Sequence, residues 1–146
     1  MTELADFEGL AAADNGLCVV VTTRADGTAQ ASVVNAGVMP HPVTGESVVA
    51  LVARGSTRKV ANLRARPRMT VVARSGWQWA AVEGATSIIG PDDPSGFTAD
   101  AIRVLLRDVF TAAGGTHDDW DEYDRVMLDD RRAAVFVTPE RVYSNG

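Results

Sequence analysis

Cysteine and histidine are scarce in this sequence of 146 residues, which has one cysteine and two histidines. Cys18 has no partner for an internal disulfide, and its place in the apolar run LCVVV indicates a buried, unreactive thiol. His41 and His117 lie far apart along the chain, so the ligand cluster of a metal ion is missing and we expect no metal site. The sequence also lacks a glycine-rich phosphate loop, a G-x-S-x-G motif and a nucleophile beside a base, so no catalytic side chain is predicted.

Long apolar runs are absent as well, and none approaches the roughly 20 residues that span a bilayer. The opening residues MTELADFEGL carry acids where an export signal would carry basic residues, which together with the lone cysteine favours a cytoplasmic protein. The net charge of -5 and the isoelectric point near 4.9 argue against nucleic acid as a partner. The length favours one domain, residues 1–146, large enough to bury a core.

Acidic residues are missing from one window in particular, between Glu46 and Glu83. Half of the 14 basic residues fall inside this basic window: Arg54, Arg58, Lys59, Arg64, Arg66, Arg68 and Arg74. Such a concentration of positive charge in an acidic protein predicts an anionic partner, and the lack of local acids leaves the partner's approach unopposed.

Periodicity and turn signals predict a fold with more strand than helix. Helices are expected over residues 3–12, 57–66, 98–113 and 116–130, the last with Thr116 as its N-cap. Strands are expected over residues 17–23, 28–36, 47–53, 69–74, 79–89 and 133–144. Strands in hairpin order with few helices between them predict a small antiparallel barrel in the α+β class.

Four phrases of the sequence carry a family resemblance that covers nearly the whole chain. They are RADGTAQASVV, STRKVANLRARPRMTVV, GWQWAAVEGAT and DDWDEYDRVMLDDRRAAVFVTPERVYS. In this order they resemble the split β-barrel flavin-binding family that includes pyridoxamine phosphate oxidase. They are most similar to its branch that uses the deazaflavin coenzyme F420. The resemblance implies a six-stranded antiparallel split β-barrel of the FMN-binding type.

The start of the helix in the basic window gains a function from this resemblance. Ser56 is a good N-cap there, and the free N–H groups at a helix start favour an anion. Thr57 adds a hydroxyl donor, while Arg58 and Lys59 sit where a cation is unfavourable until an anion binds. We therefore predict a phosphate site at these four residues, with a solvated basic face as the alternative.

The remaining cations of the window are interpreted in two groups. The deazaflavin coenzyme carries a phosphodiester and a tail of glutamates, so it is a long polyanion that suits many cations better than a single phosphate does. Arg54 and Arg74 are expected to reach this tail. For Arg64, Arg66 and Arg68 a solvated basic face is the expectation.

The resemblance also implies that the cofactor's ring lies along the second and third strands. In this sequence those positions are Ser32, Val33, Val34, Asn35, Val52 and Ala53. Backbone groups are expected to fix the ring's pyrimidine edge with help from the Ser32 and Asn35 side chains, although Asn35 also suits a strand end. Trp77 and Trp79 are two residues apart and are expected on one strand face. They would wall the ring or substrate pocket, contact a second copy of the chain, or simply pack.

An F420-dependent reductase follows as the expected function. The cofactor would transfer a hydride to an unsaturated small molecule, for which the family suggests tetrapyrroles such as biliverdin or quinones, and the protein would orient the reactants. No side chain is named as proton donor, so solvent fills that role. An FMN-binding enzyme on the same barrel and a non-catalytic F420-binding protein are the alternatives.

A homodimer with cofactor sites at its interface is also expected. A barrel that is open along one side leaves apolar surface and strand edges, which a two-fold partner covers. Trp77, Trp79, Val142 and Tyr143 are the predicted contacts. The resemblance implies that residues of both chains surround each ring.

Overall fold

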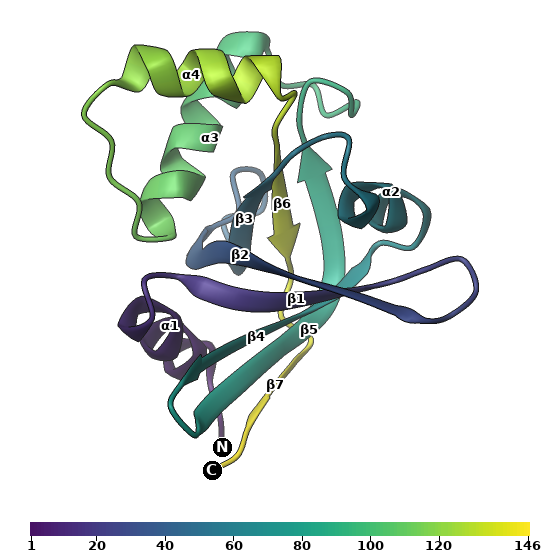
Figure 1. Ribbon diagram of the computed structural model, residues 1–146, viewed down its shortest axis with the longest axis vertical. Helices are drawn as coiled ribbons and strands as arrows, with labels where there is room; N and C mark the ends of the chain where they lie inside the picture. Colours follow the sequence, from purple (N-terminus) through teal and green to yellow (C-terminus); the bar gives the residue numbers. More distant parts are fainter.

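The computed structural model describes every residue from Met1 to Gly146. Figure 1 shows α3 and α4 together at one end of the molecule, with both termini at the other end. No helix combines the length and the apolar character needed to cross a membrane. The elements are α1 (Leu4–Ala13), β1 (Leu17–Thr23), β2 (Ala29–Pro40), β3 (Ser47–Ala53), α2 (Arg58–Ala65), β4 (Arg68–Ser75), β5 (Gln78–Ile89), α3 (Ala99–Ala112), α4 (Trp120–Asp129), β6 (Ala133–Val137) and β7 (Arg141–Ser144).

Six strands close into an antiparallel barrel in the order β4-β1-β2-β3-β6-β5, so the predicted fold class is confirmed. Pairing of β4 with β5, from Arg68–Ala85 to Ser75–Gln78, completes the ring of strands. The expectation of a barrel open along one side is therefore wrong, because the hairpin that joins β4 to β5 also closes it. Strand β7 pairs with β5 outside this ring.

Two long strands, β2 and β5, change partner part-way along their length and so join the two halves of the barrel. β2 pairs with β1 as far as Asn35 and with β3 from Ala36 onward. β5 likewise pairs with β4 as far as Ala85 and with β6 from Thr86. Gly37 lies on β2 just after this change of partner, and a Cβ there would stand 2.1 Å from the carbonyl oxygen of Ala112. Glycine at this position therefore lets the end of α3 pack directly on β2.

Two predicted elements differ from the structure. The strand expected over 133–144 is two strands, because the chain turns at Thr138–Glu140, where Pro139 has no N–H to continue a ladder. The last helix begins at Trp120, not near Thr116, and its N-cap is Asp119. The Asp119 carboxylate accepts a hydrogen bond from the Glu122 N–H at 3.1 Å, which stabilises that start.

The sheet separates two apolar cores. The barrel interior contains Phe7 of α1 together with Leu51 of β3, whereas the outer core packs α3 and α4 against Ala50 of β3 and Phe136 of β6. Neighbouring residues of one strand thus point to opposite cores, as the two-residue period of a strand requires. Because α3 and α4 rest on the outside of β3 and β6, they stand beside the position where β2 leaves β3.

Candidate functional site

A cavity of about 450 Å³ opens where β2 and β3 part, and we call it the basic cavity. The β2–β3 ladder ends at Ala36–Leu51, after which β2 continues along β1 and β3 continues along β6. The gap between the strands is closed by the start of α2 and by α3 and α4. Its walls are formed by Val33, Val34, Asn35, Val52, Ala53, Arg54, Thr57, Lys59, Val109, Phe110, Ala113, Tyr123, Met127 and Arg132.

The start of α2 faces this cavity with unpaired backbone donors. Thr57, not the predicted Ser56, is the N-cap, and its Oγ1 accepts from the Val60 N–H at 3.5 Å. The same hydroxyl donates to the carbonyl oxygen of Arg54 at 2.9 Å, so its proton is already engaged and the predicted free donor is absent. The N–H groups of Arg58 and Lys59 have no partner within the chain. They carry the partial positive charge of the helix start, which attracts an anion.

Lys59 is the only lysine of the chain, and its side chain lies inside the basic cavity. Only 8% of the residue is exposed, and its Nζ donates to the Ser32 hydroxyl at 3.3 Å. No carboxylate pairs with it. Burial, and next the positive charge of Arg132, lower the pKa of Lys59 below the ordinary lysine value. A buried cation without a counter-ion is costly, and an anion bound in this cavity would offset that cost.

A buried polar chain holds α2 in the position that places Lys59. The Asn62 Nδ2 donates to Thr22 Oγ1 at 3.1 Å, and that hydroxyl donates to Gln30 Oε1 at 3.1 Å. On the same helix, Val60 and Leu63 are three residues apart, and both are buried in the barrel core. Apolar contact thus fixes the helix on the barrel, and the hydrogen bonds to β1 and β2 fix its register.

Two arginines add positive charge to the cavity wall. Arg54 and Arg132 both approach one carboxylate oxygen of Asp130, at 3.6 and 3.1 Å. Lys59 is the third cation of the wall and has no carboxylate partner, and the wall itself contains no acidic residue. The cavity is therefore electropositive although the protein as a whole is acidic.

The wall formed by α3, α4 and Arg132 was not predicted from the sequence as part of a site. Val109 and Phe110 lie on the apolar stripe of α3, but the spacing of such a stripe does not indicate that it borders a cavity. Tyr123 donates its hydroxyl to the Leu106 carbonyl oxygen at 3.0 Å, and burial raises the pKa of Tyr123 to about 12. Its proton is therefore held against a backbone acceptor. The doublet Arg131-Arg132, directly before the last strands, is the one sequence feature that could have indicated a cation at this wall.

Several predicted site residues lie outside the basic cavity. Ser32 contacts it only through Lys59, and Ser56 and Arg58 are exposed beside it. Trp77 lies in the turn between β4 and β5 and is 94% exposed, so the prediction that it shares a strand face with Trp79 is wrong. That hairpin is at the end of the molecule opposite α3 and α4 (Figure 1).

Trp79 and Arg74 of this hairpin, and Asn35 of β2, all have partners within the chain. Trp79 packs edge-on against Tyr143 with the ring centroids 6.1 Å apart. The backbone N–H of Trp79 donates to Asn145 Oδ1 at 3.0 Å. Arg74 donates to the Gly76 carbonyl oxygen at 3.1 Å. Asn35 does line the basic cavity, but its Nδ2 donates to the Asn15 carbonyl oxygen at 2.9 Å and thereby anchors the loop before β1. These contacts give all three residues a structural role.

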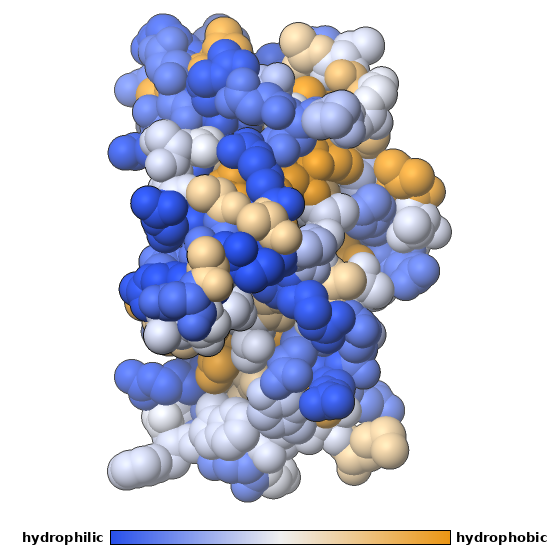
Figure 2. Space-filling view, turned by 90° about the vertical axis from the view of Figure 1, so that its right-hand side faces the viewer, coloured by the Kyte–Doolittle hydropathy of each residue, from blue (hydrophilic) through white to orange (hydrophobic).

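Arg64 and Arg66 near the end of α2 and Arg68 at the start of β4 lie at the surface, as expected for a solvated face, but each also has a partner within the chain. Arg64 makes two hydrogen bonds of 2.9 Å to Asp93, and Arg68 pairs with Glu140 at 3.1 Å. Arg66 donates to the Thr23 carbonyl oxygen at 2.7 Å. These acids come from segments outside the basic window. The window therefore contains no acid in the sequence, but the fold brings acids to it. Figure 2 shows this mostly hydrophilic side of the molecule.

Solved structures match the chain over nearly its full length, while no family model matches its sequence. A conserved hypothetical protein of Mycobacterium tuberculosis has a TM-score of 0.68 at 18% identity, over 99% of this chain and 84% of its own. An F420 reductase has a TM-score of 0.64 at 16% identity, over 98% of both chains. A pyridoxamine 5'-phosphate oxidase-related, FMN-binding protein from Nostoc punctiforme has a TM-score of 0.64 at 8% identity, over 97% of this chain and 82% of its own.

The closed barrel and these matches together decide the fold. This chain has the split β-barrel fold of the pyridoxamine 5'-phosphate oxidase-like proteins. The resemblance inferred from the sequence phrases is thereby confirmed at the level of fold. Within this split barrel, the basic cavity lies where β2 changes partner, which is the side of the second and third strands that the resemblance indicated for a ring.

Proposed function

We propose that this split-barrel protein is an F420-dependent oxidoreductase that transfers a hydride between the deazaflavin and an unsaturated small molecule. The observation that carries the proposal is Lys59, a buried cation with no carboxylate partner, beside the unpaired N–H groups at the start of α2. An anionic group bound there gains a charge-assisted hydrogen bond and the helix-start donors together. A cofactor phosphate supplies such a group.

The residues of the cavity fit a cofactor with an anionic part and a flat apolar part. Lys59, the start of α2 and Arg132 would hold the phosphodiester, and the exposed Arg58 and Arg54 would meet the acidic tail. Val33, Val34, Val52 and Ala53 offer an apolar surface at the strand edges for the ring. The bound deazaflavin supplies the hydride, and the protein orients it and excludes water.

The substrate class follows from the same cofactor chemistry. An acceptor with conjugated double bonds, such as a biliverdin-like tetrapyrrole or a quinone, matches hydride transfer without a protein nucleophile. Tyr123 does not serve as acid, because its pKa is raised and its proton is held by the Leu106 carbonyl oxygen. The accompanying proton is therefore assigned to solvent.

FMN is the second candidate cofactor, and the paired arginines favour it. Since Arg64, Arg66 and Arg68 are engaged within the chain, fewer cations remain for a polyanionic tail than the sequence suggested. A single phosphate would be satisfied by Lys59 and the helix start alone. The F420 reductase that matches over 98% of both chains supports the deazaflavin instead. A non-catalytic F420-binding protein differs from the proposed enzyme only in turnover.

A homodimer that completes the cavity remains part of the proposal. Val33 lines the basic cavity and is 64% exposed, so the cavity is open on the side of β2. Val19 is its direct partner on β1 and is also exposed. A second copy covering this apolar pair would close the cavity, in addition to the contacts predicted at Trp77, Trp79, Val142 and Tyr143.

Titration of the purified protein with F420 and with FMN, read by cofactor fluorescence at matched salt, tests the proposal. We expect tighter binding of F420, and an affinity that falls as salt rises, because charge pairs in water are screened over about 8 Å at physiological ionic strength. Equal or preferred binding of FMN would remove the deazaflavin assignment. Failure of both to bind would remove the cofactor site itself.

A further inference from the structure

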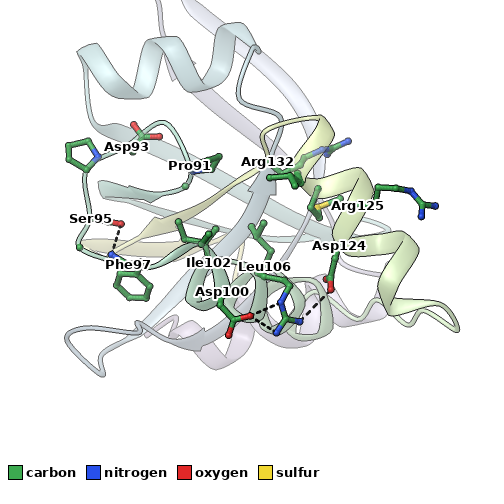
Figure 3. Close-up of a pocket in the computed structure, with 17 residues that line it drawn as sticks. Pro91, Asp93, Ser95, Phe97, Asp100, Ile102, Leu106, Asp124, Arg125 and Arg132 are labelled. Carbon is green, nitrogen blue, oxygen red and sulfur yellow. Dashed lines mark hydrogen bonds and ion pairs between the residues drawn. The ribbon is translucent and has the colours of Figure 1, made fainter.

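We propose that the chain has a second small-molecule site, for an uncharged and largely apolar ring compound, outside the basic cavity. A cavity of about 780 Å³ lies between the loop Gly90–Phe97, α3 and α4, and we call it the helix cavity (Figure 3). This volume is in the range of natural ligand pockets, which are mostly apolar with a few polar groups. Its apolar wall is formed chiefly by Phe97, Ile102, Leu106, Met127 and Leu128.

Ion pairs hold the three walls of the helix cavity in place. On the loop, Asp93 receives two hydrogen bonds of 2.9 Å from Arg64, and Asp92 is paired with Arg131. Between the helices, Asp124 of α4 accepts from Arg107 of α3 at 2.8 Å. The loop is thus tied to α2 and to the start of β6, while α3 is tied to α4. Because these pairs are partly exposed and surface ion pairs contribute little to stability, they add to the apolar packing of α3 and α4 on the sheet, which does most to hold the walls.

The charges on these walls indicate what kind of ligand fits. Arg103 is already paired with Asp100 at 2.8 Å and with Asp124 at 3.4 Å. Arg132 is paired with Asp130 at 3.1 Å. Arg125 is the one lining cation without an ion pair, but it is exposed, and Figure 3 shows its side chain directed away from Ile102 and Leu106, so its charge stays in water outside the apolar part of the cavity. An ionic ligand would therefore lose its water without meeting an unpaired opposite charge, whereas an uncharged ring would gain apolar contact.

The helix cavity is separate from the basic cavity. Met127 and Arg132 contribute to both, so they form the partition between the two. The basic cavity holds the buried, unpaired Lys59, and the helix cavity has no such cation. The two neighbouring cavities thus suit different ligands, an anionic one and an uncharged one. This inference does not depend on which cofactor binds in the basic cavity.

Calorimetric titration with naphthamide and with naphthoate tests the proposal, because these probes share a ring system and differ in charge. We expect naphthamide to bind the full-length protein and naphthoate to bind at least about tenfold more weakly, since the anion must be desolvated without a partner. Leu128→Glu places a charge at the mouth of the helix cavity, where Leu128 is 65% exposed, and should weaken naphthamide binding by about tenfold.

Val104→Glu is the matched control, because Val104 is an exposed apolar residue of α3 that does not line the helix cavity. It should bind naphthamide like the wild type, and thermal unfolding of both variants checks that each is folded. Saturation with FMN and the Lys59→Met substitution should also leave naphthamide binding unchanged. No binding of naphthamide, its displacement by FMN, its loss in Lys59→Met, or equal losses in both glutamate variants would overturn the proposal. A change of oligomeric state in Leu128→Glu alone would show that a second copy occupies the cavity instead.

Discussion

Both ends of α2 carry basic residues, but the basic group at the start has no counter-ion, whereas those at the other end are paired. At its start, Lys59 is buried without a carboxylate, and the N–H groups of Arg58 and Lys59 have no partner. At its other end, Arg64 and Arg66 are hydrogen-bonded to an aspartate and to a backbone carbonyl. Both ends belong to one acid-free run of the sequence. Positive charge along a sequence is therefore not the same as positive charge available to a ligand.

The difference arises from what the barrel brings to each end. Asp93 is 29 residues from Arg64 and Glu140 is 72 residues from Arg68, and both acids reach the far end of the basic window through the fold. The start of α2 instead faces the gap between β2 and β3, where apolar strand residues supply no acid. We infer that an anion binds at the start of the helix and not at its end.

Replacement of Lys59 by methionine should change cofactor affinity more than any other substitution in α2. Loss of the buried ammonium group should weaken cofactor binding by about 1–3 kcal/mol, the range for a hydrogen bond to a charged group. Thermal stability without cofactor should stay the same or rise, because an uncompensated charge is removed from a buried position. Fluorescence titration and thermal unfolding measure the two quantities. A large loss of stability with unchanged affinity would make Lys59 a structural residue.

Asn62→Ala tests whether the contacts in the middle of α2 position its start. The substitution leaves the buried Thr22 hydroxyl without its donor, at a cost of about 1–3 kcal/mol in the free energy of unfolding. Cofactor affinity should fall by less than in Lys59→Met, because the ammonium group is still present but less well placed. Asn62→Asp keeps an acceptor for Arg66 but loses the donor to Thr22, and serves as the comparison variant. Unchanged affinity in a clearly destabilised Asn62→Ala protein would separate the polar chain from the site.

Cofactor affinity should also fall as the pH rises, because Lys59 at the start of α2 loses its charge. The pKa of Lys59 is lowered in the folded protein, so raising the pH through that pKa removes the charge and weakens binding. Stability without cofactor should rise over the same range, because the unfolded chain, with its higher lysine pKa, binds more protons. Lys59→Met should show neither trend. An identical pH profile in this variant would assign the dependence to another group.

Arg64→Gln should give the smallest effect. Its ion pair with Asp93 is partly exposed, and such pairs contribute about 0–1 kcal/mol to stability. Cofactor affinity should match that of the wild type within error, since Arg64 is already paired and lies outside the basic cavity. A loss of affinity comparable to that of Lys59→Met would show that the far end of α2 also meets the ligand.

Much of the fold could be predicted because local pattern determines it. The apolar runs that form β1 and β3 are each followed by an arginine, and their predicted bounds, 17–23 and 47–53, match the structure. The division of the last strand at Pro139 was missed, since apolar and β-branched residues lie on both sides of it. Caps were less predictable, because Ser56 and Thr57 are equivalent as sequence and only the path of the backbone selects Thr57.

Less of the candidate site could be predicted, for a physical reason. Residues on β2, β3 and α2 were identified through a resemblance, and the structure brings most of them to one cavity. The opposite wall, with Tyr123 and Arg132, depends on how α3 and α4 pack on the outside of the sheet, which no local pattern encodes. The ion pairs of Arg64 and Arg68 likewise depend on contacts between distant segments.

The side chain of Lys59 offers the most direct measurement of the central claim, because the chain contains no other lysine. Protein labelled with isotopes only at lysine gives one side-chain signal, whose NMR titration reports the pKa of this single group. We predict a pKa below the ordinary lysine value without cofactor and a clear rise when F420 or FMN is bound, as an anion stabilises the ammonium form. An ordinary pKa that does not change when cofactor binds would contradict the claim that Lys59 is the buried, unpaired cation of an anion site.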